Sequence, residues 1–333
     1  MNKSLPRIPK SGFKEIAELA GVSVSTVDRV LNERGTVSPA ARAKVLAAAG
    51  QLDIRRILPA LAQHRRIEIV MPQNATPFWQ QLDAAFRQLS HDLAKVLTLH
   101  RTFLPQNRPD DWIRTISYPH ARRDALIIAA DGKDEFAQSL SRAAHRGEEV
   151  VTLTTRVDDG LPHSGIDNFS AGQMAGRLLY RGLPQGGDVL VLKATDRRRA
   201  HDERVAGFLS MGAPRDVHVI TTRENPERTR SALRELLLMR DIAGIYTTEY
   251  CPIVMRDILR DVPRRPVWIG HEQTPEITDC ISADLLQFSI DQEPEAQAIW
   301  ALKLATRAWA DLAPYFALAR PPMARLLFRE NLG

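Results

Sequence analysis

Polar and aromatic side chains that could bind a hydroxylated ligand follow several short apolar runs of this sequence. An aromatic ring can contact the C–H face of a sugar, while amides and carboxylates hydrogen-bond its hydroxyl groups. In open α/β sheets, ligands bind outside the carboxyl ends of the strands, so residues directly after each run are candidates. This rule selects Asn74, Phe78, Trp79, Asp131, Thr155, Arg156, Thr248, Glu249 and Glu272.

Several of these candidates also have purely structural interpretations. Phe78 and Trp79 could form the first buried turn of a helix, and Asp131 could cap the helix that follows it. Arg156 could be a surface charge. If Arg156 lies in the ligand site instead, its positively charged donor groups indicate an acidic or phosphorylated ligand.

The elements that must position these side chains are alternating strands and helices. Alternation of this kind predicts parallel sheets covered on both faces, and there are too many strands for one small sheet. We therefore expect two α/β lobes of similar size, hinged together. The apolar runs are 67–71, 96–100, 125–129, 149–153, 189–193, 217–221, 243–248 and 267–270.

A different pattern occupies residues 13–52, where three short amphipathic helices are predicted. The first ends at Gly21, where a left-handed residue is needed, and Ser23 is placed to cap the second helix at 24–31. Ser38 followed by Pro39 is typical of a third helix start. Two helices joined by a short turn and buttressed by a third indicate a helix-turn-helix DNA reader.

The second of these helices would enter the major groove of DNA. Val24, Ser25 and Arg29 would reach base edges, since Arg can bond a guanine bidentately and Val can contact a thymine methyl. Charge favours this interpretation over a plain helical bundle. Residues 1–66 carry 12 Lys and Arg against five Asp and Glu, whereas the rest of the chain is slightly acidic.

The segment IAELAGVSVSTVDRVLN at 16–32 resembles the headpiece of the LacI family of bacterial transcription regulators, whose pattern reads I-x-D-V-A-x-x-A-G-V-S-x-x-T-V-S-R-V-L-N. The resemblance implies that Val24, Ser25 and Arg29 read bases. It also implies that the phosphate and backbone contacts are made by Ser23, Thr26, Asn32, Thr36 and Ser38.

Asp28 departs from the family pattern, which usually has Ser at that position. A carboxylate there would repel phosphate, accept a hydrogen bond from a cytosine amino group, or hold Arg29 in place. The segment 51–66 resembles the family's hinge, in which a Leu is inserted into the minor groove, and Leu61 is the matching residue. Pro59 would break a helix begun before it, so a plain basic linker is the alternative.

The remainder of the chain resembles the type I periplasmic sugar-binding fold that this family carries as its effector domain. The motifs are GIDN at 165–168, RVAGF at 204–208, IGHE at 269–272 and IDQEP at 290–294. The resemblance implies that Arg204 is the first ligand-binding residue of the second lobe and that Gln292 lies at a crossing between lobes. Crossings are expected near 167, 285–291 and 317–322, with a last strand at 324–328.

These patterns predict a small all-α headpiece followed by a two-lobed, parallel-sheet α/β domain. The expected boundaries are 1–52 for the DNA-binding domain, 53–66 for the hinge and 67–333 for the effector domain. Within the last, lobe 1 comprises about 67–167 and 291–317, and lobe 2 about 168–287 and 322–333.

The composition is that of a soluble globular protein, with 44% hydrophobic and 26% charged residues. No signal peptide or membrane-spanning run is seen, and two cysteines fit a reducing cytoplasm. His201 and His271 lack a second His at metal spacing, so we expect hydrogen bonding there and neither a metal nor a cofactor.

The sequence therefore predicts a cytoplasmic transcription regulator, most simply a repressor, with operator DNA and a small sugar, sugar acid or sugar phosphate as partners. The tail has no heptad repeat, so a homodimer is expected. The rival interpretations are a sugar-modifying enzyme or a solute-binding protein fused to a DNA-binding domain. Neither a phosphate loop nor a nucleophile elbow is present, which disfavours the enzyme.

Overall fold

The computed structural model describes residues 10–31, 37–38, 40–41, 44–45, 48, 65–131, 134–183, 187–195, 198–212 and 216–332. The chain divides into two compact units, which we describe separately. The N-terminal unit comprises residues 1–66 and 90–98, and the other comprises residues 67–89 and 99–333.

In the N-terminal unit, α1 (Lys10–Ala20) and α2 (Val24–Leu31) are joined by a tight turn. Gly21 in that turn has φ +62°, in the left-handed region that Gly adopts without steric cost. The Oγ atom of Ser23 accepts a hydrogen bond from the backbone N–H of Thr26 at 3.1 Å. The predicted helix end and the predicted N-cap are therefore both confirmed.

The core of this unit is small and aliphatic. Ile16 and Val27 are completely buried against Val30 and Val45, which fixes the angle between the two helices. Leu19 does not join this core, because 49% of its surface is exposed. Of the predicted third helix, residues 40–41, 44–45 and 48 are helical, and its remaining positions lie outside the described residues.

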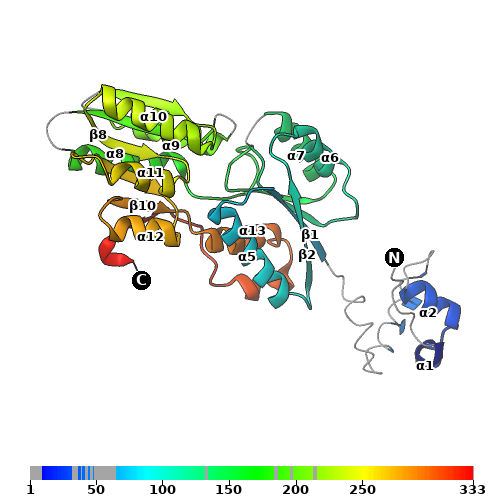
Figure 1. The fold of residues 1–333 in the computed structure, drawn as a ribbon. Coiled ribbons are helices and arrows are strands. Elements are labelled where there is room, and N and C mark those ends of the chain that lie inside the picture. Colours follow the sequence, from blue (N-terminus) through cyan, green and yellow to red (C-terminus); the bar gives the residue numbers. More distant parts are fainter. Residues whose placement is uncertain are drawn as a thin grey trace. The chain divides into compact units, whose positions relative to one another are not determined.

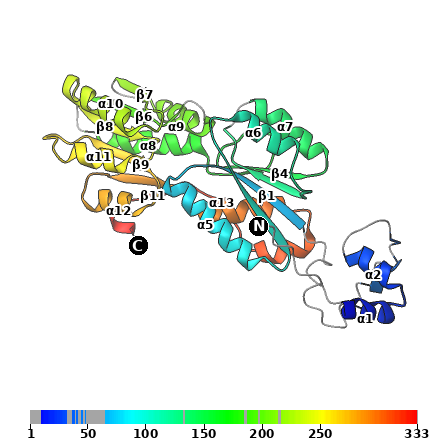
Figure 2. The same cartoon turned by 45° about the vertical axis from the view of Figure 1, so that its right-hand side comes forward.

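The second unit contains two β-sheets, and Figures 1 and 2 show them as separate layers with helices around them. The first has strand order β2-β1-β3-β4-β5. Its strands are β1 (Arg65–Pro72), β2 (Leu97–Leu104), β3 (Ala125–Ile128), β4 (Glu149–Leu153) and β5 (His163–Ser164). The helices of this lobe are α5 (Pro77–Asp92), α6 (Pro109–Ser117), α7 (Asp134–His145) and α13 (Pro294–Ala305).

The second sheet has strand order β11-β10-β9-β8-β6-β7. Its strands are β6 (Asp188–Lys193), β7 (Val217–Thr221), β8 (Ile242–Thr247), β9 (Val267–His271), β10 (Phe288–Asp291) and β11 (Arg325–Leu327). Its helices are α8 (Asn168–Gly182), α9 (Arg199–Leu209), α10 (Pro226–Met239), α11 (Pro252–Leu259) and α12 (Pro275–Ser282). The short 3-10 helices η1 (Ala310–Phe316) and η2 (Arg329–Asn331) complete the chain.

Burial on both faces explains why these strands read as continuous apolar runs. Along β6, Val189 and Val191 belong to the core beneath α8 and α9, whereas Leu190 and Leu192 belong to the core beneath α10, α11 and α12. Successive side chains of a strand point to opposite faces, so a strand that is covered on both sides carries mainly apolar residues. The predicted two-lobed parallel α/β fold is confirmed.

The chain passes between the two sheets three times. It leaves the first sheet between β5 and α8, returns between β10 and α13, and leaves again between η1 and β11. The region 285–291, predicted as a crossing, contains the strand β10, and the crossing follows it. The last strand, β11, is antiparallel to β10, and it lies within the predicted 324–328.

Six elements of the described chain were not predicted: β5, β10, α12, α13, η1 and η2. Both missed α-helices begin with a proline in the first helical position, at Pro275 and Pro294, which is a recognisable start signal. The paired segment β5 is only two residues long, too short for any periodicity to be read.

The helices α8 and α9 approach unusually closely. A Cβ atom added to Gly172 would lie 2.0 Å from the carbonyl oxygen of Arg204, and one added to Gly207 would lie 2.0 Å from that of Phe169. Two glycines, one on each helix, therefore permit the contact. This contact positions the part of α9 that carries Arg204.

None of the helices in the described part of the chain is long and apolar enough to cross a membrane.

Substituting Gly172 by Ala should destabilise the α/β unit by at least about 2 kcal/mol, because a backbone carbonyl cannot yield to the added methyl group. Gly182 at the end of the same helix is a matched control, since a Cβ there would meet nothing within 4 Å. Urea unfolding of both variants measures the difference. Equal losses in the two would contradict the close packing.

Candidate functional site

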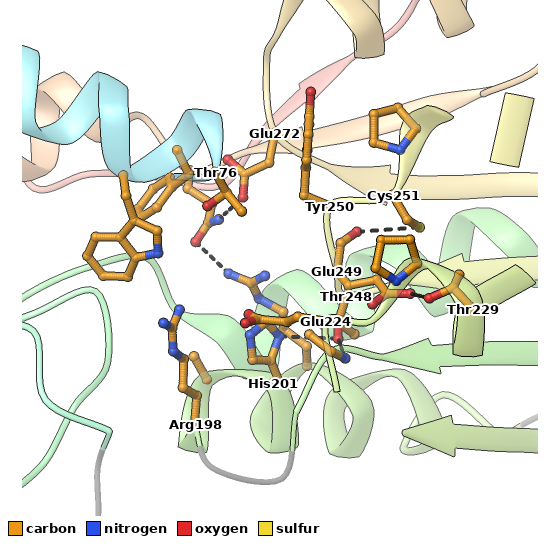
Figure 3. Close-up of a pocket in the computed structure, with 18 of the residues that line it drawn as sticks. Thr76, Arg198, His201, Glu224, Thr229, Thr248, Glu249, Tyr250, Cys251 and Glu272 are labelled. Atoms are coloured by element: carbon orange, nitrogen blue, oxygen red, sulfur yellow. Dashed lines mark hydrogen bonds between the residues drawn. The ribbon is translucent and has the colours of Figure 1, made fainter. Parts of the chain in front are cut away.

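A pocket of about 410 Å³ lies where the carboxyl ends of strands from both sheets meet. Figure 3 shows its side chains converging from the two lobes. The first lobe contributes residues from the loop after β1, from the start of α5 and from the loop after β4. The second lobe contributes the loops after β6, β7, β8 and β9 together with the segment after β10.

The wall from the first lobe is aromatic. Phe78 and Trp79 lie in the first turn of α5 with their ring centroids 5.2 Å apart and their planes at 82°. Both rings line the pocket although each is less than a tenth exposed. The side chain of Asn74 does not line the pocket, because its Oδ1 accepts from the backbone N–H of Thr76 at 2.8 Å and shapes the turn before α5.

On the other side, the lining residues Arg204, Gln292 and Glu272 belong to a chain of four hydrogen-bonded side chains, which Asn168 completes from behind the lining. The guanidinium of Arg204 donates from Nε to Oδ1 of Asn168 at 2.8 Å and from Nη2 to Oε1 of Gln292 at 2.5 Å. Nε2 of Gln292 then donates to Oε1 of Glu272 at 2.7 Å. This chain joins α8, α9, the end of β9 and the crossing after β10.

Glu272 occupies a strained backbone conformation at the end of β9, with φ +85°. Two hydrogen bonds hold it there: its N–H donates to the carbonyl oxygen of Ile290, and its own carbonyl oxygen accepts from Oγ of Ser289. Non-glycine residues in the left-handed region are costly, and they are concentrated at binding sites and switches. Glu272, held in this conformation, is one of the residues that line the pocket.

A second group of polar side chains lies deeper in the second lobe. Nδ1 of His201 lies 3.2 Å from Oγ1 of Thr248, which also accepts from the backbone N–H of Ala194 at 3.1 Å. Burial, together with the nearby charge of Arg204, holds the pKa of His201 well below its usual value, so the ring is neutral. His201 can then bind a ligand as a neutral donor or acceptor.

Two carboxyl groups of the pocket titrate near neutral pH. Burial raises the pKa of Glu272 to about 7, opposed by the charge of Arg204 and the hydrogen bond from Gln292. Burial also raises the pKa of Glu249 to about 7, opposed by hydrogen bonds from Thr222 and Thr229. Near pH 7 each can donate a hydrogen bond to a ligand oxygen when it is protonated, or accept one from a ligand hydroxyl when it is ionised.

The structure brings most of the sequence-selected candidates together. The residues that line the pocket are Phe78, Trp79, Thr155, Arg204, Thr248, Glu249, Glu272 and Gln292. Asn74, Asp131 and Arg156 do not. Arg156 instead faces Asp159, 4.0 Å away, with 40% of its side chain exposed, so the surface-charge interpretation describes its position better.

The sequence indicates only that one arginine of the run 197–199 could close over an anionic ligand, and among the described residues of that run Arg198 lines the pocket. Its guanidinium lies over the Trp79 ring at 5.1 Å, and its Nε is 3.8 Å from Oδ1 of Asp131. It thus reaches from the second lobe to the first. It belongs to the basic run 197–199, which typically forms a solvated loop, and only the position at the start of α9 distinguishes it.

The candidate DNA-contacting residues lie on and around α2. Val24 is 42% exposed, and Ser25 and Arg29 are also exposed, whereas the buried face of the helix points to the core. Oγ of Ser23 lies 2.8 Å from Oγ1 of Thr26.

Ser38 accepts from the N–H of Ala41 at 3.3 Å, as a helix cap. Asp28 is half-buried on α2. Asn32, Thr36, Pro59 and Leu61 lie outside the described residues.

The described residues contain no cluster of three or more His, Cys, Asp or Glu that could hold a metal ion. Cys251 and Cys280 are free thiols. Burial raises the pKa of both, so they are protonated and suited to packing.

Comparison with known proteins agrees with this two-part organisation. Residues 67–311 match the family described as "Periplasmic binding protein domain", and residues 13–55 match "Bacterial regulatory proteins, lacI family". The HTH-type transcriptional repressor PurR of Vibrio parahaemolyticus is 27% identical over 204 residues, which is 59% of either chain. The ribose operon repressor of Bacillus subtilis is 28% identical over 160 residues, 42% of this chain and 49% of the relative.

The chain thus spans about half the length of the curated relatives it matches. Among solved structures, a protein of Bacteroides fragilis proposed to be a LacI transcriptional regulator superposes with a TM-score of 0.69 at 13% identity. That superposition covers 81% of this chain and 99% of the other. At this identity the likeness shows a shared fold alone.

The Glu272→Gln variant should change how stability depends on pH. The folded-state pKa of about 7 exceeds the ordinary 4.5, so the contribution of Glu272 to stability is fully present below pH 4.5 and is lost as pH rises through 7. The wild type should therefore lose up to about 1.4 kcal/mol per pH unit relative to the variant across that window. Urea unfolding of both proteins from pH 5 to 8 measures this, and identical slopes would contradict it.

Proposed function

Because this chain belongs to the lacI family of bacterial regulatory proteins and carries a periplasmic binding protein domain, we propose that it is a transcription repressor controlled by a small ligand in the cleft between its lobes. The observation that carries the proposal is the shared lining of the pocket. Trp79 comes from one lobe, Arg204 from the other, and Gln292 from a segment that crosses between them. Occupancy and lobe closure are therefore physically coupled.

The ligand that fits this lining best is a sugar or a close derivative. Trp79 offers a ring face, while Glu272, Gln292 and Thr248 offer carboxylate, amide and hydroxyl groups for hydroxyl recognition. The arginines at the cleft, Arg198 and Arg204, also suit a ligand with a carboxylate or phosphate group. The ribose operon repressor among the similar proteins supports a sugar.

We further propose that the functional form is a homodimer working in the cytoplasm, with α2 of each copy in successive major grooves of operator DNA. Half-sites one helical turn apart tolerate little error in the separation of two recognition helices. A ligand that changes lobe closure would alter that separation. The coupling must be reciprocal, so the ligand must bind the DNA complex more weakly if it releases DNA.

The experiment that tests the proposal begins with genomic fragments that the full chain retains. Mobility shifts on such a fragment, repeated with sugars, sugar acids and sugar phosphates, identify a ligand that changes DNA affinity. Thermal shifts on the same panel provide an independent measure, because stabilisation rises with ligand concentration over its dissociation constant. DNA affinity that stays constant across the whole panel would overturn the proposed control.

The Arg29→Ala variant should relax sequence preference. A bidentate contact to guanine contributes about 1–3 kcal/mol of discrimination against the wrong base. Binding of the variant to the selected fragment and to single-base mutants of it, compared with wild type, measures the loss. Lys14→Ala on α1 is the control, because loss of an exposed lysine should weaken binding to all DNA sequences by the same factor. An unchanged base preference in the Arg29 variant would exclude it as a base reader.

The Trp79→Ala variant should weaken ligand binding by about tenfold or more, because it removes the aromatic face of the cleft. Titration calorimetry with the ligand found in the panel gives the change. The matched control is Trp300→Ala on α13, because Trp300 is outside the pocket lining. Nζ of Lys303 lies over the Trp300 ring, 5.0 Å from its centroid. Equal affinities in the Trp79 variant and the wild type would place the ligand elsewhere.

A further inference from the structure

The pocket continues beyond the cleft between the lobes into the second lobe. Its far part is bounded by the starts of α10 and α11, at Pro226 and Pro252, and by the loop after β8 that carries Glu249 and Cys251. Figure 3 shows Thr76 and Arg198 at one side of the pocket and Thr229 and Cys251 at the other. We call this far part the α10–α11 subsite.

Glu249 is held at the bottom of the α10–α11 subsite by two hydroxyl groups. Oγ1 of Thr222, after β7, donates to its Oε2 at 2.5 Å, and Oγ1 of Thr229, on α10, donates to its Oε1 at 2.9 Å. The side chain is buried, and no Arg or Lys of the described residues forms an ion pair with it. The thiol of Cys251 also contacts this carboxyl group, and the acceptor capacity that remains on the two oxygens can be used by a group in the pocket.

The carboxylate of Glu249 therefore fits a ligand that offers hydroxyl donors rather than an anion. A buried carboxyl group without a cationic partner is unfavourable unless it is hydrogen-bonded, and an added anion would increase the repulsion. The pKa of this group, raised by burial to about 7, agrees with a site that exchanges hydrogen bonds with neutral hydroxyls.

The rest of the α10–α11 subsite supplies the other contacts that a sugar ring requires. Pro226, Pro252 and Ile253 form an apolar wall against which C–H groups can pack. The N-cap of α11, Cys251, makes no side-chain hydrogen bond to the first turn, whereas Asn225 accepts two from the first turn of α10. A ligand hydroxyl beside α11 could accept a hydrogen bond from a backbone N–H in the first turn of α11 and donate one to the carboxylate of Glu249.

The loop between β7 and α10, which bounds the subsite, is strained. Arg223 and Glu224 are consecutive non-glycine residues with φ +61° and +54°. Backbone hydrogen bonds from Thr222 and Glu224 to Lys193 and Ala194 hold the loop in this shape. Two adjacent left-handed residues have a free-energy cost that a loop serving only as a connection would not need.

We infer that the ligand has two hydroxylated parts, one sugar ring against Trp79 in the cleft and a second ring against Glu249 in the α10–α11 subsite, so that the effector is a disaccharide or comparable glycoside. This inference rests on the proposed function, because it assumes a carbohydrate effector. The second ring touches only one lobe. It therefore adds affinity in open and closed forms alike, while the first ring drives closure.

Titration calorimetry on the full chain tests the inference. The probes are glucose, galactose, fructose, ribose and gluconate, together with maltose, sucrose, lactose, melibiose and trehalose. One disaccharide should bind at least about tenfold more tightly than either of its constituent sugars. Glu249→Gln should lower that affinity by about tenfold, the size expected for loss of a charged hydrogen bond, and leave unaffected the affinity for the constituent sugar that binds in the cleft against Trp79.

Two further variants keep this test decisive. Glu227→Gln lies on the same helix as Thr229, but its side chain is 82% exposed and outside the pocket, so it should change neither affinity. Ile253→Trp is a surface change at a half-exposed position, chosen in case Glu249→Gln fails to fold. It should obstruct the α10–α11 subsite and weaken disaccharide binding alone.

The outcomes separate this inference from the proposed function. A single sugar that binds as tightly as every disaccharide containing it, or equal effects of Glu249→Gln on both kinds of probe, would overturn the two-part ligand and leave a sugar-controlled repressor intact. Failure of every carbohydrate to bind would overturn both.

Discussion

The buried guanidinium of Arg204 is the interaction on which the candidate site depends. A charge removed from water is tolerated only when its donors are satisfied, and here Asn168 and Gln292 accept from it. These partners come from α8 and from the crossing after β10. The two hydrogen bonds therefore fix the positions of α8 and of this inter-lobe segment relative to α9. The close approach at Gly172 is needed because a bulkier residue would push α9, and Arg204 with it, out of reach.

On either side of Arg204, the pocket presents two regions with different polar groups. Toward the first lobe, Arg198 over Trp79 provides positive charge and a flat ring. Toward α10 and α11, Glu249 provides a carboxylate without an ionic partner among the described residues, beside prolines. A ligand that satisfied only one of these regions would leave the other solvated. The lining thus selects among ligands by where their polar and apolar groups lie along the molecule, as well as by how many such groups they have.

Much of the fold could be predicted because its signals are local. Gly21 and Ser23 mark a helix end and a helix start through contacts within four residues, and the strands read as apolar runs because both of their faces are covered. The missed helices α12 and α13 carried proline start signals that apolar periodicity alone did not reveal. The strand β10 was mistaken for a crossing, since both lie within a few residues of Asp291.

By itself, the sequence determined the helix-turn-helix unit, the two-lobed α/β domain and the strand ends at which polar groups gather, because these depend on neighbours along the chain. Only the tertiary structure decided which strand-end residues share one pocket. Arg156 directly follows a strand and turns to the surface, whereas Arg198 comes from a basic loop and reaches Trp79. Arg204 and Gln292 meet although 88 positions separate them. Such pairings depend on sheet order and on the crossings between lobes, which no local pattern encodes.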